Sequence, residues 1–180
     1  MGCSWHKVTV ADLGEVVGGA TPSTKNQAYW DGEIAWLSPK DLTGHGSRYI
    51  SHGARNITQA GFDSCSTRML PRGTVLFSSR APIGYVAIAG VDLCTNQGFK
   101  SVVPNNHTDS LFLYYLLKHN ADAIERQGSG TTFKEVSGKT MRRVEVLVPN
   151  SLDVQKKIGA VLGSIDSKIE LNNRLNDYLA

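Results

Sequence analysis

The 180-residue sequence has few cysteines and no long apolar run. Its three cysteines (Cys3, Cys65 and Cys94) are widely spaced and form no C-x-x-C pair. This spacing excludes a disulfide framework and a zinc knuckle, and it predicts free thiols. The longest apolar stretch, Leu111–Leu117, is far shorter than the roughly 20 residues that a membrane span needs. The first ten residues contain no apolar core of a signal peptide, so we expect a cytoplasmic protein without a membrane segment.

Common catalytic motifs are also missing. There is no Gly-x-Gly-x-x-Gly or Gly-x-Ser-x-Gly, and a phosphate-binding loop ending at Gly138-Lys139-Thr140 would need glycine in place of Phe133. The five histidines form no i, i+4 pair, and the acidic residues are scattered singly. We therefore predict neither a catalytic residue nor a metal site. The enzymatic alternative is a nuclease or methyltransferase site assembled from scattered residues, which metal- or S-adenosylmethionine-dependent activity of the purified chain would reveal.

Charge separates the chain into two parts. Of the 19 Lys and Arg and 16 Asp and Glu, residues 151–180 contain four of each, so the net charge of +3 belongs to residues 1–150. Such mild basicity is only weak support for nucleic-acid binding. With 41% hydrophobic and 19% charged residues, the chain can build a packed core.

The first 107 residues contain short β-branched and aromatic runs between turn residues, a pattern that predicts strands. Residues 78–84 contain Pro82 and Gly84, and we interpret them as a shaped loop between two strands. After residue 108, helical spacing from Ser110 to Ile124 predicts a helix that ends at Gly128-Ser129-Gly130. A short helical turn is expected over 133–139 and a strand over 142–148. The five predicted earlier strands are Val8–Val10, Glu33–Leu37, Thr74–Phe77, Tyr85–Ala89 and Ser101–Val103.

Residues 151–180 form the pattern of one long helix with a coiled-coil seam. The seam residues recur with steps of four and three, which gives a narrow apolar stripe. A helix of about 28 residues would be about 42 Å long and could not bury this stripe on a small domain, so a partner helix is expected. The alternative is a helix that folds back on its own core. The seam residues are Ile158, Leu162, Ile165, Ile169, Asn172, Asn176 and Leu179.

Several ordered blocks of the sequence resemble one known family. They are GGATPST, YWDGEIAWLSPKDL, ITQAG, LPRGTVLFSSRAPIGYVAIAG, TNQGFKSV, GSGTTFKEVSGKTM, VEVLVPNSLDVQKKIGAVLGSID and KIELNNRLN. In this order and spacing they resemble the specificity (S) subunit of type I restriction–modification enzymes, from about Trp5 to Leu179. Each block alone is a weak signal, and their common order carries the resemblance.

The resemblance implies a protein that reads DNA and leaves the chemistry to its partners. Specificity subunits of this family usually carry two target recognition domains, each followed by a long helix, and the two helices pack antiparallel as a ruler between two DNA half-sites. This chain resembles one domain and one helix, either a piece of a longer subunit or a half-subunit that pairs with itself. Methyltransferase (M) subunits would supply S-adenosylmethionine chemistry, and a restriction (R) subunit would use ATP and Mg²⁺.

One polar segment lies between the family-like blocks, where a subunit that changes its DNA specificity would be free to vary in sequence. Arg can contact guanine, and Asn or Gln can contact adenine, through paired hydrogen bonds. Residues 47–56 are thus a candidate base-reading loop, with a solvated surface loop as the alternative. Its candidate residues are Arg48, Tyr49, His52, Arg55 and Asn56.

A second set of candidates lies within the family-like blocks. Arg80, Asn96 and Gln97 could approach DNA, but we favour a structural role for them because the blocks are shared by readers of many sequences. Thr131, Thr132 and Lys134 suit either phosphate contact or helix capping. Lys139 and Arg142, with Arg143, could form a basic patch that faces phosphate. The tryptophans Trp5, Trp30 and Trp36 are expected in packing, since base stacking suits unpaired strands.

The sequence therefore predicts an α+β fold. A globular DNA target recognition domain with a twisted sheet and short helices would span 1–150, and a coiled-coil spacer and dimerisation helix would span 151–180. The expected function is sequence-specific recognition of one half-site of double-stranded DNA. The expected partners are the M and R subunits and a second copy of the chain, which would form a homodimer. The alternative is an adaptor that recruits a methyltransferase without a sequence preference of its own.

Overall fold

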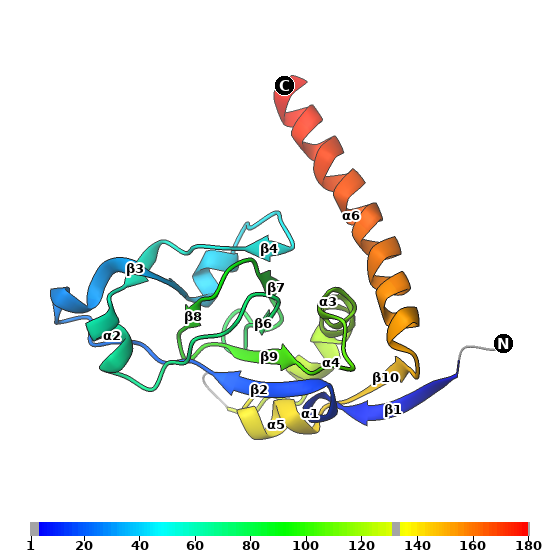
Figure 1. The fold of residues 1–180 in the computed structure, drawn as a ribbon, viewed down its shortest axis with the longest axis horizontal. Helices are drawn as coiled ribbons and strands as arrows, with labels where there is room; N and C mark the ends of the chain where they lie inside the picture. Colours follow the sequence, from blue (N-terminus) through cyan, green and yellow to red (C-terminus); the bar gives the residue numbers. More distant parts are fainter. Residues whose placement is uncertain (1–3, 131–133, 180) are drawn as a thin grey trace.

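The computed structural model describes residues 4–130 and 134–179, with side chains described as far as residue 176. A β-rich body carries short helices, and the 28-residue helix α6 (Leu152–Leu179) projects away from it (Figure 1). Among the described helices, none is long and apolar enough to cross a membrane. The predicted α+β class with a twisted sheet and a long final helix is confirmed.

The central sheet has five strands in the order β2-β9-β6-β7-β4. All neighbours are antiparallel except the short edge strand β4, which is parallel to β7. Side chains alternate between two cores: Val75 and Phe77 face one cluster, and Leu76 between them faces another. The strands are β2 (Gly14–Gly18), β4 (Tyr49–Ile50), β6 (Val75–Phe77), β7 (Val86–Ala89) and β9 (Lys100–Pro104).

A smaller sheet, β5-β3-β8, extends from the other side of this body (Figure 1). Its core contains Trp30 and Trp36, whose rings meet edge to face with 5.2 Å between centroids. Their indole nitrogens donate to the carbonyls of Ser23 and Ala20, which ties the loop before β3 to the sheet. The sheet and its flanking helices comprise β3 (Trp30–Leu37), β5 (Arg55–Ile57), β8 (Cys94–Thr95), α2 (Gln59–Asp63) and the 3-10 helices η1 (Gln27–Tyr29) and η2 (Pro39–Leu42).

Packing is thus confirmed for two of the three tryptophans. Trp5 is the exception, because half of its surface is exposed. It lies on β1 (Trp5–Thr9), which pairs antiparallel with β10 (Glu145–Pro149) and places the start of the domain beside the start of α6. Between β1 and β2, Val10 begins the one-turn helix α1 (Val10–Leu13), so the predicted strand Val8–Val10 is wrong at its end.

The helix predicted from Ser110 is divided in two. The structure has α3 (Ser110–His119) and α4 (Ala121–Arg126), separated at Asn120. The side-chain nitrogen of Asn120 donates to the Leu116 carbonyl, and the Asp109 carboxylate accepts from the Phe112 amide as the cap of α3. The apolar side of α3 covers one face of the central sheet.

The segment after residue 134 differs from the prediction. The helix is α5 (Gly138–Arg143), and the strand β10 starts only at Glu145. The helix starts late because the Ser137 hydroxyl accepts from the Thr140 amide at 3.0 Å and caps it there. Arg142 and Arg143 are consequently helical residues and not strand residues.

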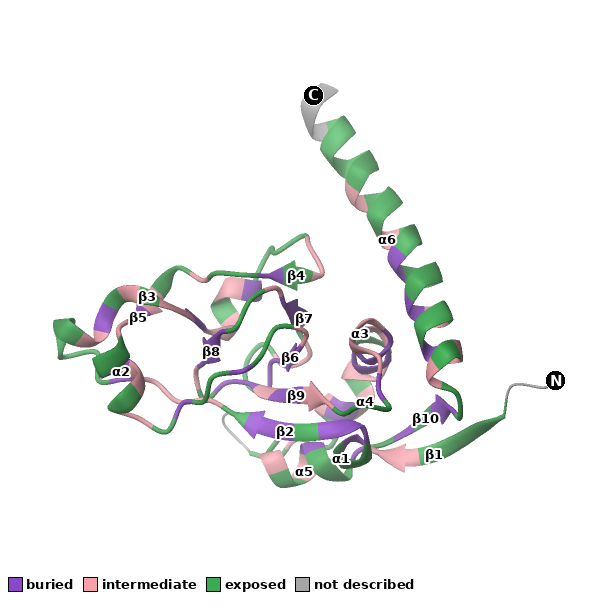
Figure 2. Cartoon of the chain, viewed as in Figure 1, coloured by how far each residue is buried: buried purple, intermediate pink, exposed green. Residues whose placement is uncertain are grey.

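Helix α6 contacts the body along a stripe that the sequence prediction did not use. Gly159 and Gly163 face α3, and the Gln155 side chain hydrogen-bonds to the segment just before it; a Cβ atom at Gly159 would come within 3.0 Å of the Phe112 nitrogen. The predicted seam lies beside this stripe: Ile158 is half-buried, whereas Leu162, Ile165 and Ile169 are exposed. The helix folds back on its own body as far as Glu170, and the described side chains beyond that residue are exposed (Figure 2).

Candidate nucleic-acid interface

The segment from Ser47 to Asn56 crosses the exposed edge of both sheets through β4 and β5. The Asp41 carboxylate holds its shape, since it accepts from the Ala54 amide and, through its other oxygen, from the Ser38 amide and hydroxyl. Tyr49 and His52 line an open hollow of about 440 Å³ at this edge, and both side chains are exposed. Their hydrogen-bonding groups are therefore presented to solvent on a fixed backbone.

Arg55 lies at the start of β5 and is held against the tryptophan core. Its guanidinium carbon is 4.2 Å from the centroid of the Trp30 ring, and one nitrogen is 3.5 Å from the Asp31 carboxylate. The side chain keeps 41% of its surface exposed. An arginine that is stacked on one side and open on the other has few conformations to lose on contact with a guanine edge. Asn56, half-buried, pairs with Ala35 in the adjoining strand.

Arg48 does not extend into solvent with its neighbours. One guanidinium nitrogen donates to the Gly163 carbonyl and the other to the Ser167 hydroxyl, both at 2.8 Å. Only 13% of its side chain is exposed. Arg48 is directed into α6, away from the open face of the segment, and a base contact by Arg48 stays a prediction.

Two glycine-containing loops meet beside β8 and β9. The Thr21 hydroxyl donates to the side-chain oxygen of Gln97 at 2.6 Å, and the Asn96 side-chain oxygen accepts from the Gly98 amide at 2.8 Å. Gly19 lies so close to the Thr95 carbonyl that a Cβ atom could not be accommodated. These contacts give Asn96 and Gln97 the structural role that we favoured, and a DNA contact by either stays a prediction.

Glu135 joins the loop 78–84 to β9. Its two carboxylate oxygens lie 3.0 Å from Arg80 Nε and 3.3 Å from Lys100 Nζ. Partial burial raises the pKa of this carboxyl, but the hydrogen bonds and charges of Arg80 and Lys100 outweigh it and hold the pKa below its usual value. Arg80 is thus partly neutralised by a protein carboxylate, in line with a structural role, although 47% of its side chain stays exposed.

Basic side chains gather on and beside the short helix α5. Lys139 and Arg142 are three residues apart, which places them on neighbouring positions of the helix surface, and both are exposed along with Arg143. Within residues 4–130 and 134–176, none of the three forms an ion pair. Lys134 is 3.9 Å from Glu125. Thr131, Thr132 and Phe133 lie outside the described residues.

Sequence reasoning missed the partners of two arginines. The stacking of Arg55 on Trp30 joins residues 25 positions apart, and the contacts of Arg48 with α6 join residues 115 and 119 positions apart. One signal was available: Gly159 and Gly163 are four residues apart, a spacing that permits close approach of another helix on one face. The described residues contain no group of three or more His, Cys, Asp or Glu side chains that could hold a metal.

The family model for the type I restriction modification DNA specificity domain matches residues 4–180. This chain belongs to that family. The specificity subunit of the type I restriction enzyme MjaIX from Methanocaldococcus jannaschii is 45% identical to it over 177 residues, which are 97% of this chain and 41% of that protein. The chain therefore spans about two fifths of the length of this relative.

Solved structures show the same fold as this specificity domain. The HsdS subunit of Thermoanaerobacter tengcongensis has a TM-score of 0.70 at 20% identity, with 95% of this chain and 39% of that chain covered. A chain from a study of complex assembly and conformational transition of the type I R-M system has a TM-score of 0.75 at 20% identity, with 99% and 42% covered. The family resemblance of the sequence is confirmed.

Proposed function

We propose that this chain reads one half-site of a bipartite double-stranded DNA target as part of a type I restriction–modification complex. The single observation that carries the proposal is the match of the specificity domain family over residues 4–180. Residues 1–150 act as the recognition domain and residues 151–180 as the spacer and dimerisation helix. The chain itself performs no chemistry: M subunits bring S-adenosylmethionine, and an R subunit brings ATP and Mg²⁺. The complex works in the cytoplasm, where its DNA lies.

Base reading is assigned to the exposed side chains of the segment 47–56. Tyr49, His52 and Arg55 are open to solvent on a rigid backbone, and Arg55 is pre-oriented by Trp30. Lys139 and Arg142 supply phosphate contacts: both are exposed, neither forms an ion pair with a described carboxylate, and such cations can replace counterions on DNA.

The second half-site is read by a second copy of this chain. Two α6 helices pack antiparallel through the exposed seam around Leu162, Ile165 and Ile169. Antiparallel identical chains are related by a two-fold axis, so the target is an interrupted palindrome. Asn172 and Asn176 on the seam would fix the register of the pair.

The test is a selection from a randomised duplex library, with the purified chain and again with its M subunit, at one stated salt concentration. Two inverted copies of a short motif at a fixed spacing are the expected result. A single motif would show a lone recognition domain of a longer reader, and no enrichment in either format would favour the adaptor. Salt is held constant because phosphate contacts make DNA affinity strongly salt-dependent.

A further inference from the structure

The backbone of Arg48 is hydrogen-bonded to the body, while its side chain contacts α6. Its carbonyl accepts from the Ile88 amide at 2.8 Å, so its main chain is anchored to β7 in the central sheet. Its guanidinium donates to the Gly163 carbonyl and the Ser167 hydroxyl of α6 and lies 4.0 Å from the Glu170 carboxylate. One residue thus connects the sheet to two successive turns of the helix.

The contact of Arg48 with α6 fixes the direction of the helix more than it adds to the free energy of folding. A guanidinium holds its donors in a fixed planar fork, so two bonds to Gly163 and Ser167 define a direction as well as a distance. Within the described part of the chain, the buried Nε of Arg48 has no hydrogen-bond partner. A buried cation with an unsatisfied donor is a poor source of folding free energy, because desolvation offsets much of the attraction.

Among the described residues, one further polar contact joins this level of the helix to the body. The Tyr115 hydroxyl on α3 donates to the Asp166 carboxylate at 2.8 Å. Burial, followed by this hydrogen bond, raises the pKa of the Tyr115 hydroxyl above its usual value. Beyond Glu170, every described side chain of α6 is exposed. The outer helix therefore takes its direction from contacts made before residue 171.

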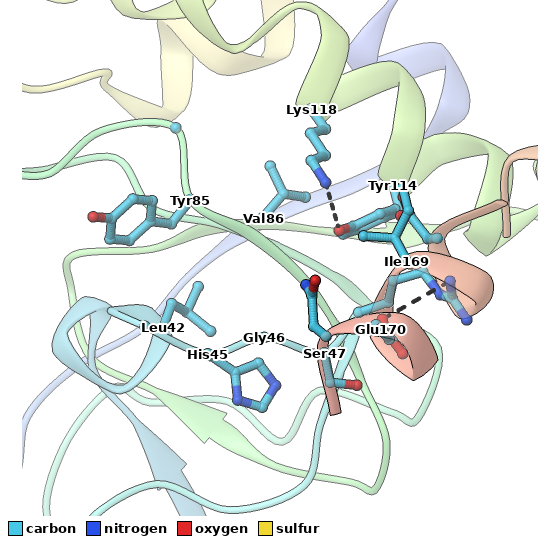
Figure 3. Close-up of a pocket in the computed structure, with 15 residues that line it drawn as sticks. Leu42, His45, Gly46, Ser47, Tyr85, Val86, Tyr114, Lys118, Ile169 and Glu170 are labelled. Atoms are coloured by element: carbon cyan, nitrogen blue, oxygen red, sulfur yellow. Dashed lines mark hydrogen bonds and ion pairs between the residues drawn. The ribbon is translucent and has the colours of Figure 1, made fainter. Parts of the chain in front are cut away.

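An open cavity separates the helix from the body beside these ties. It has a volume of about 450 Å³ and lies between the loop 42–48, the start of β7, α3 and residues 166–173 of α6 (Figure 3). Below it, Gly159 and Gly163 provide close contact with α3 without side chains that interlock. A helix that rests on glycines at its base and faces a cavity higher up can tilt unless something fixes it.

A small tilt has a large effect at the far end. Sixteen residues separate Gly163 from Leu179, which corresponds to about 24 Å of helix at 1.5 Å per residue. A tilt of about 10° displaces that end by about 4 Å, more than the roughly 3.4 Å rise of one base pair. The direction of α6 must therefore be held to within a few degrees for two paired domains to keep one half-site spacing.

We propose that Arg48 is a positioning residue that fixes the direction of α6 relative to the recognition domain and thereby restricts the complex to one spacing between half-sites. The inference rests on the proposed function for its consequence on DNA, while its structural part concerns the free protein alone. It also links the two tasks of the segment 47–56: Arg48 orients the spacer helix, and its neighbours Tyr49 and His52 face the open side.

The structural part is tested by distance measurements in the free protein. Spin labels are placed at Val91→Cys on the body and Arg174→Cys on α6, both exposed positions, after Cys3 and Cys65 are changed to serine. Cys94 is retained, because burial raises the pKa of its thiol to about 11 and keeps it protonated and unreactive. Dilution with unlabelled protein removes distances between paired copies. R48A should broaden a narrow distance distribution; an unchanged distribution overturns the proposal.

The consequence for DNA is tested by repeating the library selection with R48A, R48K and the control R68A. Arg68 forms an exposed ion pair with Glu15, and among the described residues its hydrogen bonds go to Glu15 and not to α6 or the segment 47–56. R48A should keep the half-site sequence but lower the ratio of preferred to neighbouring spacings by at least about tenfold, because it removes both charge-assisted hydrogen bonds, to Gly163 and to Ser167, and the loss of one alone has about this effect. R48K should be intermediate, since lysine lacks the fork, and R68A should match the wild type.

The outcomes separate the two proposals. If R48A is folded by circular dichroism and keeps the single wild-type spacing, the positioning role is wrong while the proposed function stands. If the wild type enriches no motif, the proposed function is wrong; if it enriches a single motif, only the pairing of two copies is wrong. In both cases the distance distributions alone decide whether Arg48 fixes the helix. If R48A is too unstable to measure, R48K provides both readouts, and its wild-type behaviour in both overturns the proposal.

Discussion

The exposed seam of α6 allows the pairing of two chains to be predicted quantitatively. In the free chain, Ile165 is 49% and Ile169 51% exposed, so about half of each side chain is left for a partner to bury. Complete burial of an isoleucine is worth about 1.5–3 kcal/mol, and the four half-exposed isoleucines of a pair therefore contribute about 3–6 kcal/mol. The double variant Ile165→Asp and Ile169→Asp should weaken dimerisation by about 10²- to 10⁴-fold.

Sedimentation equilibrium over a range of concentrations measures this change in Kd directly. The matched control carries Ala160→Asp and Ser164→Asp, which add the same charge at exposed positions off the seam. The control should dimerise like the wild type, and both variants should keep the thermal transition of the body within a few degrees, since exposed substitutions seldom cost more than about 0.5 kcal/mol. A seam variant that dimerises as tightly as the wild type would refute antiparallel pairing through these residues.

Three further predictions concern the body. The pKa of the Glu135 carboxyl is lowered in the folded state, so the stability that this group contributes is present above its unfolded-state pKa of about 4.5 and is lost as the pH falls through its folded-state pKa. The Tm difference between wild type and Glu135→Gln should therefore be largest at pH 7 and shrink below pH 4.5. A constant difference down to pH 3 would contradict this account. Changing Lys139 and Arg142 together to Ala should reduce the slope of log affinity against log salt by about 2, as measured by titration of labelled duplex at several salt concentrations; an unchanged slope would mean that neither contacts phosphate. Arg55→Ala should relax selection at one half-site position by about 1–3 kcal/mol in the library assay, and uniform weakening at all positions would instead indicate a general contact.

Some regular segments were predictable from the sequence, because the types and spacing of their apolar residues match what a strand or a helix requires. The antiparallel pair β6 and β7 around the loop 78–84 and the helix over 152–179 are examples. The strands β2, β4, β5 and β8 were not predicted, because they contain no run of β-branched and aromatic residues as long as those of β6 and β7, and the neighbouring strands decide their pairing. Local caps decided the boundaries: Ser137 delayed α5, and Asn120 divided α3 from α4.

The candidate site, too, was predictable from the sequence only in part. The DNA-reading function was proposed from the family resemblance of the ordered blocks. The segment 47–56 was marked by its hydrogen-bonding residue types and by its place between those blocks, both of which can be read from the sequence. Which of those side chains face outward was a matter of long-range contacts. Arg48 and Arg55 have the same chemistry and lie seven residues apart, yet one enters α6 and the other stacks on Trp30.

The seam of α6 shows what the sequence determines and what only the tertiary structure decides. A helix repeats every 3.6 residues, so the sequence by itself determined that one face of residues 152–179 is apolar and that a second face holds Gly159 and Gly163. Only the tertiary structure decided which face meets the body, because that choice depends on the shape of α3 and on the position of Arg48, more than 100 residues away in the chain. The glycine face fits against α3, and the apolar seam is left exposed.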